Sequence, residues 1–286
     1  MAQGKGARSK GALLITGCSS GIGHHCAYGM AARGWRVVAS CRRAEDVERL
    51  RGEGLASCLI DYADPASIEA GWAEALDLCD GRIDVLLNNG AFVQPGMVED
   101  LPVEALRAIF ETNFFGWHDL SVRALAHFRS RPGGGRIVQN SSILGFVTLA
   151  GRGAYNMTKF AIEGWSDTLR VELGRTPDIH VSLIEPGPVT SEIRRKAIPH
   201  FERWVKPRVE GSAYRRLYET KLMPRLYEGG EDRFELGPES VLKRLVHACE
   251  ARRPQARYYV TTPTYVMGAL KRVLPTRALD ALLRRA

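Results

Sequence analysis

The feature that most constrains the fold is a short apolar run, residues 12–16, that leads directly into a glycine-rich turn and a helix-like segment. Glycines at this spacing allow a tight strand-to-helix turn and a close approach of the backbone to a pyrophosphate, for which the helix N-terminus supplies N–H donors. An ordinary glycine-rich turn is the alternative, but a second apolar run at residues 35–40 favours a nucleotide site. The predicted cofactor contacts here are Gly17, Ser19, Ser20, Gly21, Ile22 and Gly23.

Apolar runs alternate with helix-like stretches along most of the 286 residues. The runs lie near residues 12–16, 35–40, 55–60, 83–88, 136–141, 179–184 and 257–261, and helix-like stretches separate them. This alternation predicts an α/β fold, a single-domain Rossmann-type doubly wound parallel sheet of about seven strands. We expect one catalytic domain over residues 11–286, with an extended substrate lid before the last core helix, and a disordered tail over residues 1–10.

A tyrosine and a lysine stand four residues apart at Tyr155 and Lys159, thirteen residues after Ser142. Positions i and i+4 share one face of a helix, so the ammonium is expected to lie near the phenol. A cation there lowers the tyrosine pKa from its usual value of about 10. The pair therefore predicts a proton donor or acceptor for carbonyl and alcohol interconversion. Alone, the spacing is common on surface helices, and its weight comes from the surrounding motifs.

The second apolar run ends in Arg42 and Arg43, where sites that prefer NAD usually carry a carboxylate for the ribose 2′-hydroxyl. Guanidinium groups instead match a 2′-phosphate. A solvated basic pair in a loop is the alternative. Because cations just before a helix face the unfavourable end of its dipole, an anionic ligand explains them better. Arg42 therefore predicts NADP(H) as the cofactor, with NAD(H) as the alternative.

Together these motifs resemble the short-chain dehydrogenase/reductase family over residues 11–190. The Asn88-Asn89-Gly90-Ala91 segment resembles the family's Asn-Asn-Ala-Gly with its last two residues exchanged, and Asn113 matches its helix asparagine. Ser142, Tyr155 and Lys159 complete the family's tetrad at the expected spacing. The subgroup that this chain resembles holds bacterial NADP-dependent aldehyde reductases and 17β-hydroxysteroid- or retinol-dehydrogenase-like enzymes.

The resemblance implies roles for further residues. Asn113 would position a water that relays protons from Lys159, which also holds the nicotinamide ribose, and Asn89 and Gly90 would line the cofactor. Asp61 would bond the adenine amino group, with an N-cap for the next helix as the alternative. The loop after the sixth strand would contact the nicotinamide through Pro186, Gly187, Val189 and Thr190.

These features predict an NADP(H)-dependent oxidoreductase that interconverts a lipophilic carbonyl, such as an aldehyde, ketosteroid or retinoid-like compound, and its alcohol, with Tyr155 as acid/base. An NAD-linked alcohol or hydroxysteroid dehydrogenase working oxidatively is one alternative, and a non-catalytic NADP-sensing protein is another. Members of the family that this chain resembles commonly form dimers or tetramers, so we expect a homodimer or tetramer. No metal-ligand spacing occurs among the histidines and cysteines, and no nucleic-acid-binding module is recognisable.

Residues 190–238 carry six aromatic side chains, which suggests a lid that closes over an apolar substrate, unless they only anchor their own helices. From Ser191 onward the chain has 21 basic and 11 acidic residues, against 19 and 21 before it. The basic amphipathic segment 265–286 could rest on an anionic membrane or pack on the domain or a second subunit. With no signal peptide recognisable and six unpaired-looking cysteines, we expect a cytoplasmic protein, in weak peripheral contact with a membrane at most.

Overall fold

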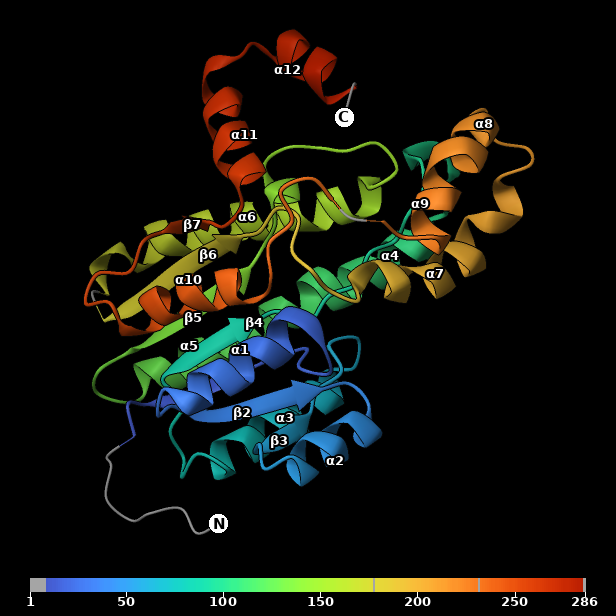
Figure 1. The fold of residues 1–286 in the computed structure, drawn as a ribbon. Coiled ribbons are helices and arrows are strands. Elements are labelled where there is room, and N and C mark those ends of the chain that lie inside the picture. The colour runs from blue at the N-terminus through green and yellow to red at the C-terminus, as the bar shows by residue number, and fades with distance from the viewer. Residues whose placement is uncertain (1–8, 177, 231, 285–286) are drawn as a thin grey trace.

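The structure is a computed structural model that describes residues 9–284 apart from residues 177 and 231, so most of the expected N-terminal tail lies outside the described residues. Seven parallel strands form one sheet in the order β3-β2-β1-β4-β5-β6-β7 (Figure 1). They are β1 (Ala12–Ile15), β2 (Arg36–Cys41), β3 (Ser57–Leu59), β4 (Val85–Asn88), β5 (Gly135–Asn140), β6 (Ile179–Glu185) and β7 (Arg257–Tyr259). The predicted doubly wound parallel sheet is confirmed.

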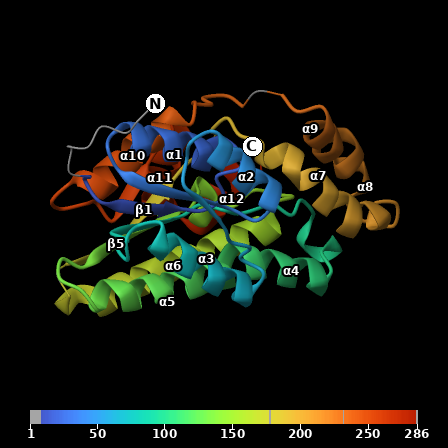
Figure 2. The ribbon, with the colours of Figure 1, turned by 90° about the horizontal axis from the view of Figure 1, so that it is seen from below.

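Helices cover both faces of the sheet (Figure 2). The apolar residues of α1, α2 and α10 pack on one face, and those of α3, α5 and α6 pack on the other. The bounds are α1 (Gly21–Ala32), α2 (Ala44–Gly52), α3 (Pro65–Asp77), α4 (Val103–Phe110), α5 (Gly116–Arg129), α6 (Gly153–Glu172) and α10 (Glu239–Glu250). The helical segment between β4 and β5 is not continuous, because a π-helical turn, η2 (Glu111–Phe115), separates α4 from α5.

The strand order reverses between β1 and β4, which are direct neighbours in the sheet. In a doubly wound sheet this point opens a crevice at the carboxyl ends of the strands, where ligands bind. The glycine-rich turn follows β1, the two asparagines end β4, and Ser142 follows β5. Segments far apart in the sequence are therefore brought to one edge.

The expected lid segment forms α7 (Ile193–Trp204), α8 (Arg215–Leu217) and α9 (Met223–Tyr227), which lie together at one end of the sheet (Figure 1). Its two ends are joined, because Val189 and Leu236 form a bridge and the Thr190 N–H donates to the Leu236 carbonyl at 3.0 Å. Phe201 and Tyr218 are fully buried in a separate apolar cluster that also contains Tyr155. These two aromatics therefore anchor the segment to the body.

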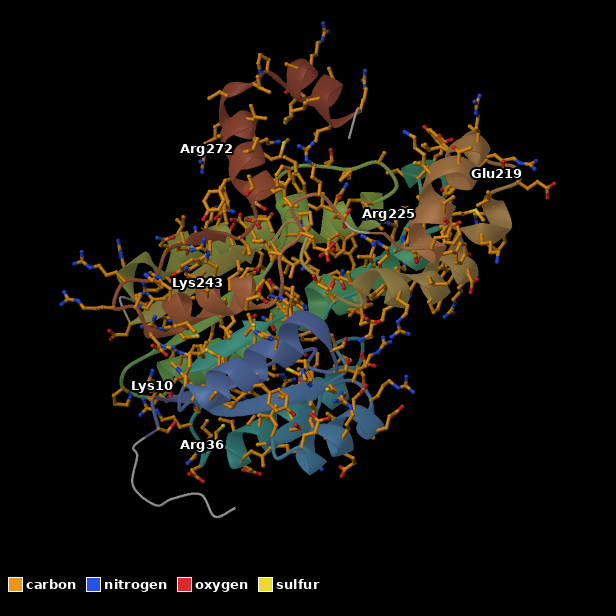
Figure 3. All side chains as sticks on the ribbon, viewed as in Figure 1. Lys10, Arg36, Glu219, Arg225, Lys243 and Arg272 are labelled. Carbon is orange, nitrogen blue, oxygen red and sulfur yellow. The ribbon has the colours of Figure 1, made fainter. Side chains whose placement is uncertain are left out.

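The chain continues beyond β7 into α11 (Thr262–Val273) and α12 (Thr276–Leu283), which project above the sheet (Figure 1). Leu279 is buried there, whereas Val266, Val273 and Leu282 are exposed. Charged side chains reach outward along much of the ribbon, including the exposed Arg272 (Figure 3). Within residues 9–284, apart from the two gaps, no helix is both long and apolar enough to cross a membrane. All six cysteines are buried, free thiols.

Candidate active site

The turn after β1 leaves the start of α1 open to an anion. Ser20 precedes α1 without capping it through its side chain, and the first helical turn has no acidic residue. The early N–H groups of a helix favour negative charge, so they fit the pyrophosphate of a dinucleotide. A Cβ on Gly23 would lie 2.4 Å from the Gly17 carbonyl oxygen. Only glycine therefore permits this tight turn.

The exchanged Gly90 lies directly against the glycine-rich turn. Gly17 has a φ of +69°, and a Cβ placed on it would lie 2.5 Å from the Gly90 Cα. The two backbones thus meet without side chains between them. Gly90 does not adopt a left-handed backbone conformation. The exchange of Ala and Gly relative to the family motif therefore matters here because Gly90 has no side chain and allows this close approach.

Asn89 holds the ends of three strands together. Its side-chain amide donates to the Thr16 carbonyl at 2.9 Å, and its side-chain oxygen accepts from the Asn140 amide at 2.8 Å. The Thr16 hydroxyl accepts the Asn89 backbone N–H at 2.9 Å and a bond from the Tyr62 phenol at 2.8 Å. Asn89 therefore supports the crevice floor mainly by fixing β1, β4 and β5 relative to one another.

Tyr155 lies on the first turn of α6 with only 8% of its surface exposed. Burial raises the pKa of Tyr155 well above its ordinary value, and the neighbouring Ser142 hydroxyl and the charge of Arg152 partly offset this rise. The sequence predicted that Lys159 lowers this pKa. That prediction is wrong for this structure: desolvation dominates, and the cation that acts on the phenol is Arg152.

Ser142 stands at the start of the short 3₁₀ turn that follows β5. Its hydroxyl accepts the Leu144 N–H at 3.1 Å and donates to the Pro186 carbonyl at 3.4 Å. The neighbouring Ser141 instead faces away from the crevice and bonds the buried Glu163 carboxylate at 2.5 Å. The structure thus brings Ser142, and not Ser141, to the Tyr155 phenol.

Lys159 is buried behind Tyr155, with 1% of its surface exposed. Its ammonium donates to the Asn140 carbonyl at 2.8 Å and lies 4.4 Å from the Trp117 ring centre and 5.5 Å from that of Tyr155. Burial lowers the pKa of Lys159 to about 7, against the opposing effect of Glu163. A lysine with this pKa can gain and lose a proton near neutral pH.

Asn113 is fully buried in the π-helical turn η2. Its side chain pairs with the backbone of Phe92, accepting the N–H at 3.0 Å and donating to the carbonyl at 2.9 Å. The amide also lies 3.3 Å from the Thr158 hydroxyl, one residue before Lys159. Single π-turns inside helices often accompany functional sites. The proposed water relay through Asn113 stays a prediction.

Two residues near the adenosine end were predicted with alternatives. The Asp61 carboxylate accepts the Ala63 N–H at 3.0 Å, whereas the N-cap of α3 is Asp64, which accepts the Ala66 N–H at 3.0 Å. The N-cap alternative for Asp61 is therefore wrong, because the helix begins three residues later. Arg42 is exposed at the end of β2, while Arg43 forms an ion pair with Glu45.

The loop after β6 is held close to the crevice. The Pro186 carbonyl accepts the Ile143 N–H at 2.8 Å, which ties this loop to the turn that carries Ser142. A Cβ on Gly187 would lie 2.1 Å from the Thr261 hydroxyl, so a glycine is needed there. The loop's predicted nicotinamide contacts therefore lie beside Ser142, and the lid segment begins directly after them.

A buried ionic network anchors α6 from behind. The Arg257 guanidinium on β7 pairs with Glu163, with Glu185 at 2.7 Å and with Asp167 at 2.7 Å. Burial raises the pKa of Glu185 to about 8, Glu163 adds to this, and Arg257 opposes it. The helix that carries Tyr155 and Lys159 is thereby fixed to the edge of the sheet.

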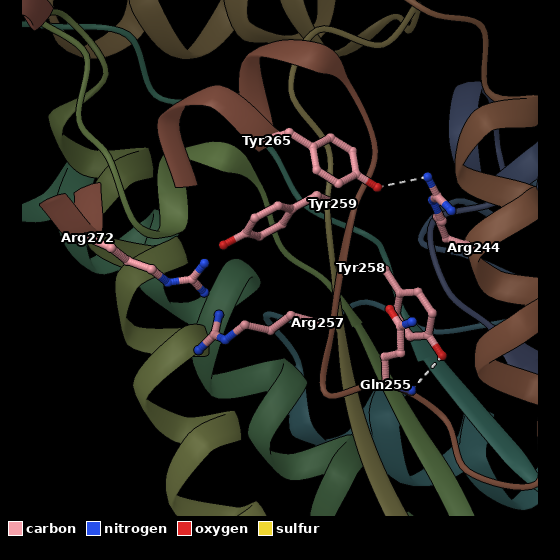
Figure 4. Close-up of a pocket in the computed structure, with 7 residues that line it drawn as sticks. All are labelled: Arg244, Gln255, Arg257, Tyr258, Tyr259, Tyr265 and Arg272. Atoms are coloured by element: carbon pink, nitrogen blue, oxygen red, sulfur yellow. Dashed lines mark hydrogen bonds between the residues drawn. The ribbon is translucent and has the colours of Figure 1, made fainter. Parts of the chain in front are cut away.

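A cavity of about 190 Å³ opens at the outer end of this network (Figure 4). Three arginines and three tyrosines line it, from α10, from the segment around β7 and from α11: Arg244, Arg257, Arg272, Tyr258, Tyr259 and Tyr265. None of the tetrad residues lines it. The crevice at the strand ends, where the tetrad and the glycine-rich turn meet, is therefore the candidate active site.

A family model for short chain dehydrogenases matches residues 11–201. The chain belongs to the short-chain dehydrogenase family. It is similar to the oxidoreductase YbbO of Escherichia coli K12, with 38% identity over 95% of this chain and 93% of that protein. It is also 32% identical to human retinol dehydrogenase 8, over 86% of this chain and 79% of that protein. The chain is thus an oxidoreductase of a family that uses nicotinamide cofactors.

Solved structures show the same fold over almost the whole chain. A short-chain dehydrogenase from Streptomyces avermitilis matches with a TM-score of 0.74 and 26% identity, over 98% of each chain. A short chain dehydrogenase from Burkholderia cenocepacia J2315, solved in complex with NADP, matches with a TM-score of 0.72 and 21% identity, over 96% of this chain and 98% of that one. The lid and tail regions are thus included in the overall match.

Several residues of the site were not predicted from the sequence. Thr16 and Asn140 adjoin the glycine-rich turn and Ser142 in the sequence, and their polar side chains at strand ends were the available signal. Arg152, three residues before Tyr155, had no such signal, because its effect on the phenol depends on burial. Lys196 on α7 likewise reaches the turn only through the tertiary fold.

Proposed function

We propose that the protein is an NADP(H)-dependent reductase of lipophilic carbonyl compounds. The observation that carries the proposal is the buried Tyr155 phenol beside Ser142 and above Lys159, with a pKa that burial raises. A tyrosine in this environment holds its proton at neutral pH and is therefore suited to donate it. Proton donation to the carbonyl oxygen is the step that a reduction requires.

The residues divide the chemistry between them. When bound, the nicotinamide cofactor supplies the hydride. The Tyr155 and Ser142 hydroxyls converge on one side of the crevice, so both can donate hydrogen bonds to a carbonyl oxygen held between them. These bonds strengthen as negative charge develops on that oxygen, which lowers the barrier selectively. Lys159, with a pKa lowered to about 7, can then return a proton to Tyr155 through intervening hydroxyl groups.

Two features support NADP(H) over NAD(H). The end of β2 carries Arg42 and Arg43 and has no carboxylate before α2. Arg42 is exposed, and its charge contributes to lowering the pKa of Lys196 and His200 on α7, the helix that contacts the glycine-rich turn. A guanidinium there suits the 2′-phosphate that distinguishes the two cofactors.

A lipophilic substrate is supported by the apolar cluster that joins Tyr155 to the lid helices. Phe92, Met97, Phe201 and Leu226 belong to it, so the buried surroundings of Tyr155 on this side are apolar. The name of the related human retinol dehydrogenase 8 points to a substrate of the same character. An oxidative NAD-linked dehydrogenase and a non-catalytic NADP sensor remain the alternative functions.

The test is a titration of the purified protein with NADPH and NADH, followed by absorbance assays with medium-chain aldehydes, ketosteroids and retinal. We expect tighter binding of NADPH and its oxidation with one substrate class. Preference for NADH together with alcohol oxidation would favour the first alternative. Tight NADPH binding without turnover on any carbonyl in the panel would favour the sensor.

Assembly and membrane contact are separate proposals. We propose a homodimer or tetramer, which sedimentation of the full chain would measure. The exposed Val266, Val273 and Leu282 of α11 and α12, beside basic side chains, are the surface that would contact an anionic membrane. Flotation with anionic liposomes tests this contact, and no co-migration would refute it.

A further inference from the structure

Helix α7 of the lid segment reaches the glycine-rich turn through one lysine. The Lys196 ammonium donates to the Ser20 hydroxyl at 2.6 Å and to the Ser19 hydroxyl at 3.2 Å. Ser19 and Ser20 are the two serines of the turn that precedes α1. The lid segment therefore places a positive charge on the part of the crevice that fits the cofactor's phosphates.

The surroundings of Lys196 point to the adenosine end of the crevice. Burial lowers the pKa of Lys196, Asp46 and Glu192 oppose this change, and Arg195 and Arg42 add to it. The Ser19 carbonyl accepts a hydrogen bond at 2.9 Å from Arg49 of α2, so Lys196 and α2 meet at Ser19. His200, one helical turn further along α7, also feels the charge of Arg42, and its ring stacks on Phe92 at 3.9 Å between ring centres.

The Cys18 N–H donates to the Ser40 carbonyl at 3.0 Å, so the turn after β1 lies against the end of β2, and an anion bound at Ser19 would lie near both Lys196 and Arg42. A phosphate monoester carries nearly two negative charges and three acceptor oxygens, so it can bind an ammonium, a guanidinium and a hydroxyl together. The pyrophosphate would lie on the N–H groups at the start of α1, next to Ser20, so the 2′-phosphate is assigned to the Ser19 side, which faces α2.

We propose that Lys196 is a second binding residue for the cofactor's 2′-phosphate, and that this contact couples cofactor choice to closure of the lid segment. The inference rests on the proposed NADP(H) dependence. Lys196 and Arg42 hold the phosphate from opposite sides, one from the lid and one from the sheet. NADPH then fixes α7 over the crevice, whereas NADH lacks the group that would do so.

Arg195, the preceding residue on the same helix, provides a matched control. It is 72% exposed and forms an ion pair with Glu192 on its own segment. Arg195→Gln removes the same charge from α7 without touching the serines. A difference between the two variants therefore reports the contact and not the net charge of the helix.

The experiment measures dissociation constants for NADPH and NADH in the full-length wild type, Lys196→Gln, Lys196→Arg and Arg195→Gln proteins. We expect Lys196→Gln to weaken NADPH about tenfold and NADH less than about twofold. Lys196→Arg should restore most of the loss, and Arg195→Gln should leave both constants within about twofold.

A second readout is chymotrypsin cleavage within residues 190–238. We expect 2′,5′-ADP to protect this segment in the wild type but not in Lys196→Gln, and 5′-ADP to protect it in neither.

Equal weakening of NADPH and NADH would overturn the assignment to the 2′-phosphate, and so would unchanged binding of both. Arg42→Gln separates this outcome from failure of the proposed function. If Arg42→Gln abolishes a preference for NADPH that Lys196→Gln retains, only the role of Lys196 is refuted. If the wild type itself has no preference for NADPH, the proposed cofactor is refuted first.

Discussion

Helices α6 and α7 approach the same crevice but are held in different ways. Eight side chains of α6 are buried, and its Glu163 and Asp167 are tied to β7 through Arg257. In α7 only Ala197 and Phe201 are buried, and a proline interrupts its hydrogen bonding at position 199. The groups proposed to carry out the chemistry are thus fixed to the sheet, whereas Lys196, proposed to bind the cofactor, stands on a helix with few buried side chains.

The sharpest test of the fixed region is Tyr155→Phe, which removes the proton donor and leaves the ring. Because general acid catalysis contributes up to about 10⁴-fold, we expect turnover to fall by about 10³-fold with little change in NADPH affinity. Absorbance assays and a fluorescence titration measure the two quantities. Near-full turnover in this variant would exclude the proposed mechanism.

Arg257→Met tests whether the ionic network anchors α6. The substitution leaves the buried Glu163, which is 8% exposed, without its cation, whereas Glu185 keeps its proton at neutral pH. Removing one partner of a buried pair typically costs about 3 kcal/mol, and we expect the free energy of unfolding to fall by that amount. Urea denaturation measures it, with exposed Arg233→Met as the control. Equal effects of the two substitutions would mean that the network does not anchor the helix.

The same network predicts a pH dependence. The pKa of Glu185 is raised from 4.5 to about 8 in the folded protein, chiefly by burial. Between these values the folded state keeps a proton that the unfolded chain releases, so stability falls as the pH rises from about 5 to 8. Relative to wild type, Glu185→Gln should remove this fall, which amounts to about 3 kcal/mol between pH 5 and 8. If the free energy of unfolding varies with pH in the same way for the wild type and Glu185→Gln, Glu185 is not the group responsible.

In the lid segment, Tyr218→Phe should act locally. The Tyr218 phenol accepts the Met97 N–H at 2.7 Å and donates to Asp100 at 2.8 Å. Losing these bonds costs about 1 kcal/mol. If α7 to α9 open as a separate unit, protease cleavage within residues 190–238 should accelerate while global unfolding changes little. An equal shift in both would show that lid and sheet unfold together.

The smallest effect is expected at Phe234, which has a φ of +64° and 52% of its surface exposed. Residues other than glycine and asparagine rarely adopt this left-handed backbone conformation. Phe234→Asn should therefore stabilise the segment by less than about 1 kcal/mol, which thermal unfolding and proteolysis can measure. Destabilisation would instead show that the Phe234 ring makes an essential contact.

The sheet and the positions of the tetrad could be predicted because their signals are local. The alternation of apolar runs encodes the strands, and the i, i+4 spacing encodes the shared face of Tyr155 and Lys159. Closely spaced glycines likewise encode the turn after β1. Each of these features is determined by residues that are close together in the sequence. The structure also places Ser142 next to Tyr155, as their spacing indicated.

The remaining features depend on contacts between distant segments. The pKa of Tyr155 is set by burial and Arg152, and desolvation cannot be obtained from residue spacing. Asp64 rather than Asp61 caps α3, because the chain turns between Asp61 and Asp64 before the helix begins. In the lid, the aromatic side chains follow no regular period, so the burial of Phe201 and Tyr218 and the exposure of Tyr214 and Phe234 could not be distinguished.

The buried cysteines have a practical consequence. Burial raises the pKa of all six thiols, so little reactive thiolate forms at neutral pH. A single cysteine introduced at an exposed lid position such as Tyr214 should therefore react with a maleimide dye far faster than the native thiols. The natural chain is thus already suited to site-specific labelling, and the motion of the lid can be followed by fluorescence without first removing any of its own cysteines.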